Sequence, residues 1–410
     1  MALALKKSLV TLILVLLSTW LISSSRQRLS VHRAHFSYTA EEGRQLRNYA
    51  AAQYAFGYHF WFYNQFQPAE KYFRRAVVAD MLYVDAWIKL GQIGASGGDP
   101  QKARQILAYT DRLTRRVFRW KWPQTLLALK LGLHDLFLRN INALVPFPAM
   151  RQNALFVLDQ HDNGNALAAA LSLIPANRPF YLDWLMRARR VKDAIAVWPQ
   201  LDPETTGNDA LQIRYVNFLL ANKYVAEAKN VWLRAGHTGI TNPGFERPIL
   251  RRAFGWHIMG PRKKSWSVRR MFISGQKTGR VLQIAFNGTE NVNFYHVYQI
   301  VPVDPGKKYE LTYEWQSDEI STDRGPFVEI YGYGCKGLYA HGPMMTGTHG
   351  WHPEQVAFTV PESCEAMVIR IRRRPSYRFD SKISGRLFID DFRLSPAVEN
   401  SMPYGRRNAK

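Results

Sequence analysis

Two kinds of hydrophobic periodicity divide this chain of 410 residues. In the first part, apolar residues recur every three to four positions, which is the spacing of amphipathic helices. After "TGITNPGFERP" (residues 238–248), short runs alternate between apolar and polar positions, as in "KYELTYEWQS" (residues 308–317). Such alternation is typical of half-buried strands. The pattern predicts a helical region over residues 40–236 and a sandwich of seven or eight antiparallel strands over residues 238–397.

The helical region contains an internal repeat. A small residue is followed four positions later by a large apolar residue, and the pairs are spaced by 34 residues: Ala69 with Phe73 before Ala103 with Leu107, and Ala194 with Trp198 before Ala228 with Trp232. The small residue lets two helices approach, and the large residue fills the groove beside the next unit. Between the first two pairs, Asp99 and Pro100 are of the types preferred at a helix N-cap and at the first helical position. These features predict stacked antiparallel hairpins.

The repeat resembles the tetratricopeptide repeat family, whose pattern is W-x2-L-G-x2-Y followed by A-x3-F. The residues that match it best are Trp87, Leu90, Gly91, Ala103 and Leu107, with leucine in place of phenylalanine at the last position. Two regular units cover about residues 50–117, and two degenerate units cover about residues 178–235. Residues 118–177 are expected to add one or two divergent hairpins. The resemblance implies a solenoid whose groove docks a protein partner.

The first residues of the chain predict a membrane anchor. Lys6 and Lys7 precede an uncharged run from Ser8 to Ser25. As a helix rising ~1.5 Å per residue, this run would nearly span the ~30 Å core of a bilayer. The alternative is a signal peptide cleaved near Ser25. We expect residues 1–28 to form a single-pass anchor in the inner (cytoplasmic) membrane, with the main body periplasmic or otherwise extracytoplasmic.

The β region carries a second resemblance, in three motifs: "NPGFE" (Asn242 to Glu246) followed by "FGWHI" (residues 254–258), "YQIVPVDPGKKYELTYEWQS" (Tyr298 to Ser317) and "LFIDDFRL" (Leu387 to Leu394). In this order they are similar to the opening strand, middle hairpin and closing strand of the carbohydrate-binding jelly rolls of the galactose-binding-like superfamily. The resemblance covers residues 238–397 and implies a sugar-binding jelly roll. It also implies a structural Ca²⁺ where the first and last strands meet, with Glu246 and Asp391 at the acidic positions. The alternative is that these two carboxylates only cap turns.

Strand parity selects candidate carbohydrate-binding residues. Tyr331 and Tyr333 share one face of "VEIYGYG", and Arg370 and Arg372 share one face of "VIRIRR". The two arginines cannot be buried without partners, so they face solvent or a groove in which the tyrosines could be their neighbours. Trp351 follows a glycine-rich turn and is expected to be exposed. An aromatic ring packs well against the C–H face of a sugar, so these five residues are the predicted binding site.

The charge of the chain favours an anionic partner. The formal net charge is +23 and the pI is near 10. Between Glu246 and Glu290 there are ten Lys or Arg and no Asp or Glu. Cations gathered in this way repel one another unless an anion shares the site. An acidic polysaccharide or the membrane surface would serve, whereas nucleic acid is not expected on a body that lies outside the cytoplasm.

The remaining chemistry is sparse. Cys335 and Cys364 are the two cysteines, and they form one disulfide in an oxidising compartment or remain separate half-buried thiols. The chain has no G-x-S-x-G elbow, no phosphate-binding loop and no H-E-x-x-H motif. We therefore expect no enzymatic activity.

These patterns together predict a multidomain α + β protein. It comprises an N-terminal membrane helix, a tetratricopeptide-like α-hairpin solenoid, a C-terminal antiparallel β-sandwich of the jelly-roll type and a basic tail over residues 398–410. The leading hypothesis is a membrane-anchored cell-envelope protein that docks a protein partner and binds carbohydrate, in the assembly or export of a surface polysaccharide. The alternative is a structural scaffold subunit whose jelly roll binds no sugar.

Overall fold

The computed structural model describes residues 39–260, 265–274, 279–379 and 381–397. The helices of these residues are α2 (Ala40–Gln45), α3 (Ala50–Phe62), α4 (Phe66–Ala79), α5 (Val84–Ser96), α6 (Pro100–Leu113), α7 (Lys121–Lys130), α8 (His134–Leu144), α9 (Pro148–His161), α10 (Ala166–Ser172), α11 (Arg178–Arg187), α12 (Val191–Val197), α13 (Pro203–Thr206), α14 (Asp209–Ala221) and α15 (Val225–Arg234). Short 3-10 turns lie at Phe118–Trp120, Pro175–Asn177 and Trp198–Gln200. Within the described ranges, no helix has the length and apolarity needed to cross a bilayer. The predicted anchor and the basic tail lie outside these ranges.

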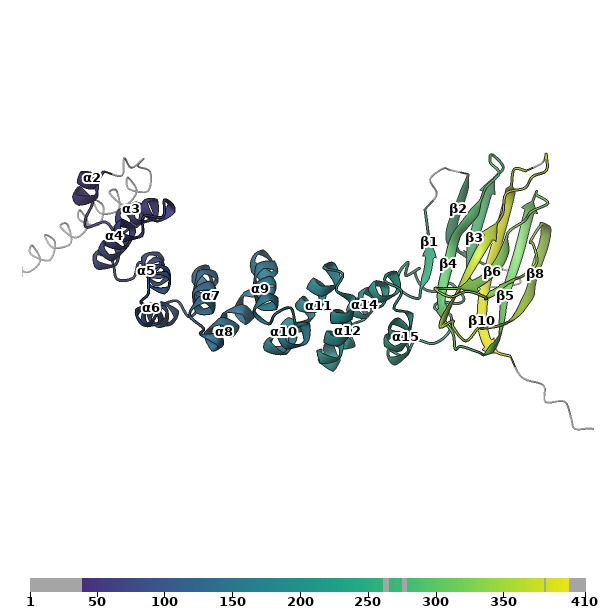
Figure 1. The fold of residues 1–410 in the computed structure, drawn as a ribbon. Helices are drawn as coiled ribbons and strands as arrows, with labels where there is room; N and C mark the ends of the chain where they lie inside the picture. The colour runs from purple at the N-terminus through teal and green to yellow at the C-terminus, as the bar shows by residue number, and fades with distance from the viewer. Residues whose placement is uncertain (1–38, 261–264, 275–278, 380, 398–410) are drawn as a thin grey trace, which may run out of the picture. The chain divides into compact units, whose positions relative to one another are not determined.

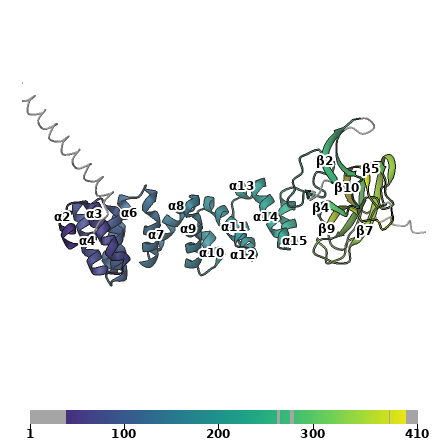
Figure 2. The same ribbon diagram turned by 90° about the horizontal axis from the view of Figure 1, so that it is seen from above.

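The helices pair as the repeat predicted. Within the first part of the chain α3 packs on α4, α5 on α6, and α7 on α8, and Figure 2 shows these helices as short neighbouring segments. The small repeat residues Ala69, Ala103, Ala194 and Ala228 are fully buried. A Cβ on Gly57 of α3 would lie only 2.6 Å from the ring of Phe73 on α4, so this glycine allows the two helices to touch. The solenoid therefore depends on small residues at its closest contacts.

Two local predictions are also confirmed. Asp99 caps α6, because its Oδ1 accepts a hydrogen bond of 3.0 Å from the main-chain N–H of Lys102, and Pro100 begins the helix. Residues 118–177 form two further hairpins, α7 with α8 and α9 with α10.

The described chain divides into two compact units, one up to Trp184 and one from Leu185 onward. The first holds the helices from α2 through most of α11. The second holds α12 to α15 and all the strands. The change from helices to strands occurs between Arg234 and Trp256. The last helices thus belong to the same compact unit as the β region.

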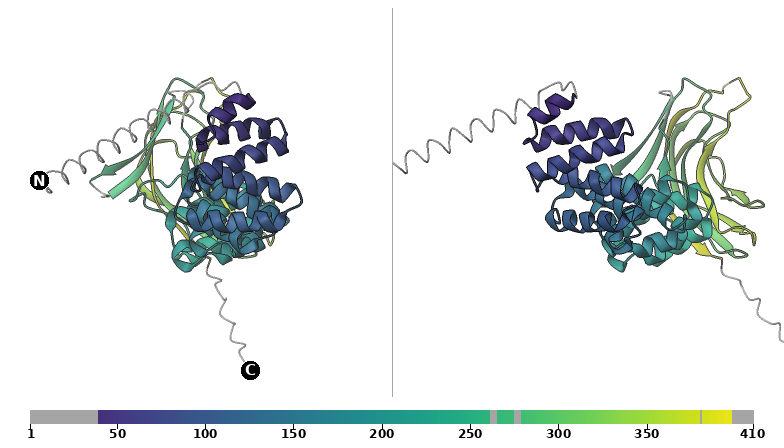
Figure 3. Two further views of the ribbon diagram at one scale, coloured as in Figure 1. Left: turned by 90° about the vertical axis from the view of Figure 1, so that its left-hand side faces the viewer. Right: turned by 60° about the vertical axis from the view of Figure 1, so that its left-hand side comes forward.

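The β region is a sandwich of two five-stranded sheets (Figure 1). Its strands are β1 (Trp256–Ile258), β2 (Trp266–Ile273), β3 (Gly279–Asn287), β4 (Phe294–Pro302), β5 (Lys308–Ile320), β6 (Phe327–Gly332), β7 (Tyr339–His341), β8 (Gly347–Thr359), β9 (Ala366–Arg373) and β10 (Ser384–Pro396). The first sheet has the order β1-β4-β9-β6-β7, and the second has the order β2-β3-β10-β5-β8. The neighbours pair antiparallel, and register shifts interrupt several of the pairings. Figure 3 shows the long strands curving.

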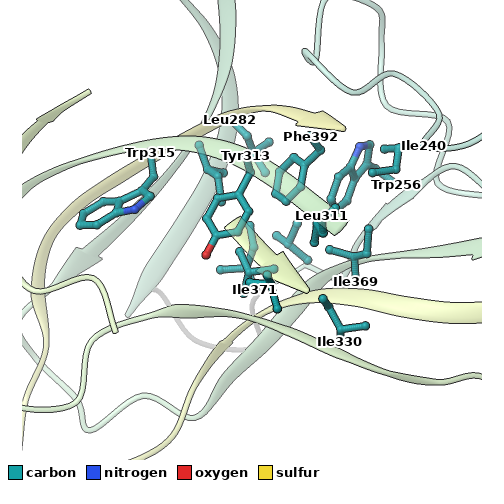
Figure 4. Close-up of a cluster of buried hydrophobic side chains, with 14 of the residues drawn as sticks. Ile240, Trp256, Leu282, Leu311, Tyr313, Trp315, Ile330, Ile369, Ile371 and Phe392 are labelled. Carbon is teal, nitrogen blue, oxygen red and sulfur yellow. The ribbon is translucent and has the colours of Figure 1, made fainter. Parts of the chain in front are cut away.

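One hydrophobic core fills the space between the sheets. Leu282, Leu311 and Tyr313 of the second sheet meet Ile330, Ile369 and Ile371 of the first, as Figure 4 shows. The alternation of apolar residues that predicted the strands is thus the alternation between core and surface. The predicted runs correspond to β3, β4, β5, β6, β8, β9 and β10. β1 lies within "FGWHI" (residues 254–258), the second part of the opening-strand motif, whereas the sequence pattern did not indicate β2 or β7.

Two further features tie the loops of the sandwich. Cys335 and Cys364 form a disulfide, which settles the question that the sequence left open. Arg373 is fully buried and donates hydrogen bonds to the carbonyl oxygens of Arg324 at 3.1 Å and Ser381 at 2.8 Å, and also to that of Val292. A single guanidinium therefore joins three loops at one end of the sandwich.

Candidate functional site

The first sheet has a surface that points away from the core, which we call the outer face. It carries His257, Tyr295, Tyr298, Glu329, Tyr331, Tyr339, His341, Arg370 and Arg372. These residues alternate along their strands with core residues such as Ile330 and Ile371. The face gathers aromatic rings and guanidinium groups, the two kinds of side chain predicted to bind sugar.

Strand pairing places part of the outer face in a single row. His257 of β1 lies opposite Tyr298 of β4, which lies opposite Arg370 of β9. Arg370 in turn faces Glu329 of β6, and Glu329 faces His341 of β7. The rings of His257 and Tyr298 stack at 4.8 Å with an angle of 6° between their planes. The row therefore crosses all the strands of the sheet, with an ion pair at its centre.

The guanidinium of Arg370 is held in place from two sides. Its Nε donates to Glu329 Oε2 at 2.9 Å, and its Nη2 bonds to the same oxygen. Its centre lies 4.6 Å from the centroid of the Tyr331 ring, in a cation–π contact. Such a guanidinium, fixed in position and partly exposed, has donors left for a ligand's hydroxyl or carboxylate oxygens.

Glu329 is the buried anchor of this arrangement, only 3% exposed although it points away from the core. Arg374 Nη2 lies 3.2 Å from its Oε1, and the hydroxyl of Tyr339 donates to the same oxygen at 3.3 Å. Burial raises the pKa of Glu329, but the hydrogen bonds and charges of Arg370 and Arg374 outweigh burial and hold the pKa below its ordinary value. Glu329 is therefore ionised at neutral pH.

The tyrosines of the face are uncharged donors. Burial, and then the neighbouring Tyr331 and Tyr333, raise the pKa of Tyr298. Burial also raises the pKa of Tyr331; Glu329 and Tyr333 add to the increase, while Arg370 opposes it. Neutral phenols can both donate to and accept from sugar hydroxyls.

The predicted site residues are not all brought together. Tyr331, Arg370 and Arg372 share the outer face, where the Arg372 guanidinium lies 5.9 Å from the Tyr295 ring centroid. Tyr333 follows the end of β6 and turns to the helices, since its hydroxyl donates to the carbonyl of Leu220 at 2.9 Å. Trp351 lies on β8, in the second sheet, and is half-buried.

Sequence reasoning missed several members of the face. Strand parity already places Glu329 on the face of Tyr331 in "VEIYGYG", but Glu329 was not among the predicted binding residues. Tyr298 and Tyr339 become neighbours of Arg370 and Glu329 only through the sheet order, which no local pattern contains.

Side-chain atoms of the two predicted calcium ligands both lie near Gly244. A Cβ on Gly244 would lie 3.7 Å from Asp391 Oδ1 and 4.0 Å from Glu246 Cγ. Glu246 Oε1 accepts the main-chain N–H of Arg280 at 2.9 Å, and Arg270 donates to the carbonyl of Glu246 at 2.9 Å. Among the described residues, no group of three or more His, Cys, Asp or Glu side chains is placed to hold a metal. The two carboxylates suit calcium in their chemistry, and the other ligands would have to be main-chain oxygens.

The helical part offers hollows of its own. In the first unit, a pocket of about 460 Å³ is lined by Trp61, Phe66, Lys89, Leu126 and Lys130, among others. The Lys89 Nζ lies 3.2 Å from the Trp61 ring centroid. Burial lowers the pKa of Lys89 to about 8 against the opposing effect of Asp85. This pocket combines apolar walls with two lysines, a composition suited to an apolar segment that carries an acidic group.

The second unit has a larger pocket, of about 610 Å³, among its helices. Trp198 and Tyr215 line it and stack with their ring centroids 4.1 Å apart.

Comparison with known proteins gives structural likeness only. No family model matches the chain, and no curated protein matches it. Similar solved structures include a family 4 carbohydrate-binding module, 16% identical with a TM-score of 0.27, covering 38% of this chain and 99% of that one. A family 61 module in complex with β-1,4-galactotriose is 16% identical with a TM-score of 0.26, covering 39% and 99%.

The helical part has its own likenesses. They include YrrB, described as a tetratricopeptide repeat protein with an unusual peptide-binding site, 12% identical with a TM-score of 0.27, covering 49% of this chain and 92% of that one. MamA from Desulfovibrio magneticus is also similar. Both kinds of fold predicted from the motifs are thus among the similar structures. At these identities and TM-scores the likeness assigns no function.

Proposed function

We propose that this chain is a non-enzymatic binding protein of the cell envelope. Its sandwich binds a polysaccharide on the outer face, and its helical region docks a protein partner. A single-pass anchor over residues 1–28 holds it in the cytoplasmic membrane with the main body outside the cytoplasm. The process it would serve is the assembly or export of a surface polysaccharide. The Cys335–Cys364 disulfide supports this placement, because such bonds persist in oxidising compartments.

The observation that carries the proposal is the pairing of Arg370 with Tyr331, held by Glu329. Glu329 is a buried carboxylate that binds the guanidinium groups of Arg370 and Arg374, and these charge-assisted hydrogen bonds hold Arg370 in position beside Tyr331. Around it, Tyr295 and Tyr339 are exposed rings that can stack on sugar C–H faces.

The charge of the face supports an acidic glycan. Arg370, Arg372 and Arg374 gather around one carboxylate, that of Glu329. Burial, and then the charges of Arg370 and Arg374, lower the pKa of Arg372 against the opposing charge of Glu329, so the neighbouring cations repel one another. A uronate or another anionic sugar unit would relieve this repulsion.

A glycan-binding measurement on the full chain tests the proposal. We expect polygalacturonate, an acidic glycan, to bind more tightly than neutral galactan. Tyr331→Ala should weaken binding at least about tenfold, the loss of one stacked, hydrogen-bonded contact. Tyr377→Ala is the matched control, because this tyrosine is 90% exposed on a loop and also lies against an arginine. Equal loss in both variants would contradict the assignment.

A second candidate function has its own observation. Lys229 of α15 donates to the carbonyl of Val303 at 2.8 Å and to Asp304 at 2.9 Å, so the sandwich is fastened to the last hairpin. A scaffold subunit would need this attachment and no sugar site. Absence of binding to any neutral or acidic glycan by the wild-type chain would favour the scaffold.

The same proposal includes a structural Ca²⁺ with Glu246 and Asp391 as its carboxylate ligands. Added Ca²⁺ should raise the melting temperature of the wild-type sandwich. It should not raise that of the Glu246→Gln variant, and an equal rise in both would contradict the assignment.

A further inference from the structure

A separate cavity lies where the last helical hairpin meets the start of the sandwich. We call it the junction cavity. Its volume is about 180 Å³, and its walls include Gln212 of α14, Trp232 of α15, His237, Arg247 and Trp256 of β1. All of these belong to the second compact unit. None of the outer-face residues lines it, so it is distinct from the proposed glycan site.

The two tryptophans bring unpaired donors to this cavity. Trp232 is 2% exposed and Trp256 is 1% exposed. Among the described residues, neither indole Nε1 has a hydrogen-bond partner. A buried N–H left without an acceptor is unfavourable, so two tryptophans with unpaired indole N–H groups in the wall of one cavity point to an acceptor that enters it.

The rings are held in place by packing. The His237 ring stacks on Trp232 with centroids 4.1 Å apart. The ring centroids of Trp256 and Phe392 are 5.0 Å apart, and Figure 4 shows both residues in the cluster of buried side chains. The walls are therefore rigid and aromatic, as ligand sites at element junctions commonly are.

Two charged side chains line the cavity, the guanidinium of Arg247 and the carboxylate of Asp209. The main chain of Arg247 is fixed, because its N–H donates to Asn242 Oδ1 at 2.9 Å and its carbonyl accepts from Asn242 Nδ2 at 2.7 Å. In the described part of the chain its side chain forms no ion pair. Asp209, which also lines the cavity, stands at the first residue of α14, where the helix N-terminus favours a carboxylate.

The size of the cavity limits the ligand. A volume of about 180 Å³ is the share of roughly six water molecules. Drug-sized ligands occupy pockets of ~300 Å³ or more. Indole and guanidinium groups donate and never accept, so the matching ligand group is one that only accepts, such as a carboxylate. We propose that the junction cavity binds a small carboxylate-bearing molecule, of the size of one sugar acid or less, between the two indoles and Arg247.

Indole NMR signals of the ¹⁵N-labelled full chain test this directly. The Trp232→Phe and Trp256→Phe variants keep an aromatic ring and identify the two indole signals by their loss. D-glucuronate should shift both signals in the wild-type chain, whereas D-glucose, which lacks the carboxylate, should not. Acetate tests whether a carboxylate group alone is enough for binding. A shift of the same two signals by acetate would support binding of the carboxylate group itself.

Arg247→Gln supplies the affinity test without touching a buried side chain. It should weaken glucuronate binding by about tenfold or more, as expected for loss of a charged hydrogen-bond partner. Trp198→Phe is the control, because Trp198 lines a different pocket and its signal should not move. The proposal is overturned if glucuronate and acetate leave both signals unchanged, or if glucose shifts them equally. Equal shifts of all indole signals would also overturn it. Tyr331→Ala should leave these shifts intact, which separates this site from the glycan face.

Discussion

Replacing Glu329 by glutamine removes the negative charge that pairs with Arg370 and Arg374 on the outer face. Glutamine has nearly the same shape, so the change tests charge rather than packing. Arg370 would then keep its place over Tyr331 with no counter-charge, and Arg374 would lose its partner as well. We expect the sandwich to be destabilised.

The expected magnitude follows from exposure. Removing one partner of a fully buried pair costs about 3–5 kcal/mol. The side chain of Glu329 is 4% exposed, but those of Arg370 and Arg374 are 24% and 51% exposed, so water replaces part of the lost interaction. We therefore expect a loss of about 2–3 kcal/mol for Glu329→Gln. The coupling between Glu329→Gln and Arg370→Gln should be about 1.5–2.5 kcal/mol in a double-mutant cycle.

Hydrogen exchange followed by mass spectrometry reports the free energy of opening for β6 and β9 separately from the helices. The matched control is the pair Asp318 and Arg386 on the second sheet, whose charged atoms are 3.7 Å apart with side chains 40% and 59% exposed. Its coupling should stay below about 0.5 kcal/mol. If the Glu329–Arg370 coupling is no larger than that of the control, the buried anchor does not exist as described.

The same carboxylate sets a pH dependence. The pKa of Glu329 is held below its ordinary value of 4.5 in the folded state. Its stabilisation is therefore complete above that ordinary value and is lost as the pH falls through the lower, folded-state pKa. Wild-type β6 and β9 should lose protection on acidification in this range, whereas the Glu329→Gln protein should show a flatter profile. Parallel profiles would contradict the assigned ion pair.

Three further changes test the framework. Arg373→Met leaves three loop carbonyls without their donor and should cost about 3 kcal/mol in urea unfolding of the sandwich; a cost below about 1 kcal/mol would show that the loops do not need it. In an exposed helix, replacing a glycine by alanine stabilises by about 1 kcal/mol. At Gly57 the added methyl group would collide with the ring of Phe73, so Gly57→Ala should destabilise the protein by about 1–3 kcal/mol in thermal unfolding. A stabilised Gly57→Ala variant would contradict this packing. A chain of residues 185–397 should melt at a higher temperature than one of residues 238–397, because only the longer chain retains the whole compact unit; equal melting temperatures would place the boundary at 238 instead.

Strand faces were predictable because one face of each strand is buried. In β9 the sequence separates Ile369 and Ile371 from Arg370 and Arg372, and the structure puts the first pair in the core and the second on the outer face. A shift of one residue would bury both arginines, so the alternation leaves a single solution. The small residues of the helical repeat were predictable for a similar reason, since larger ones cannot fit between the helices.

The composition of the site was less predictable, because it depends on which strands become neighbours. Tyr298 and Arg370 are far apart along the chain and meet because β4 pairs with β9. Tyr333 has the parity of Tyr331, yet the strand ends at Gly332 and the next residue turns to the helices. β7 was missed because three residues are too few to show a period, and β1, which is equally short, was indicated only by the motif resemblance.

Tyr333 connects the sandwich to the last helical hairpin. The hydroxyl of Tyr333 donates to the carbonyl of Leu220 at the end of α14, and Lys223 Nζ lies 4.5 Å from the Tyr333 ring centroid. Burial raises the pKa of Tyr331 on the outer face, and Glu329 and Tyr333 add to that increase against the opposing charge of Arg370. Tyr333 thus contacts a helix, while Tyr331, two residues earlier, lies on the proposed glycan site. Lys229 of the same hairpin bonds to the sandwich, and Trp232 of that hairpin lines the junction cavity. The hairpin is therefore a structural part of the compact unit that carries both proposed sites. A ligand that binds Tyr331 therefore binds a compact unit that also includes α14 and α15.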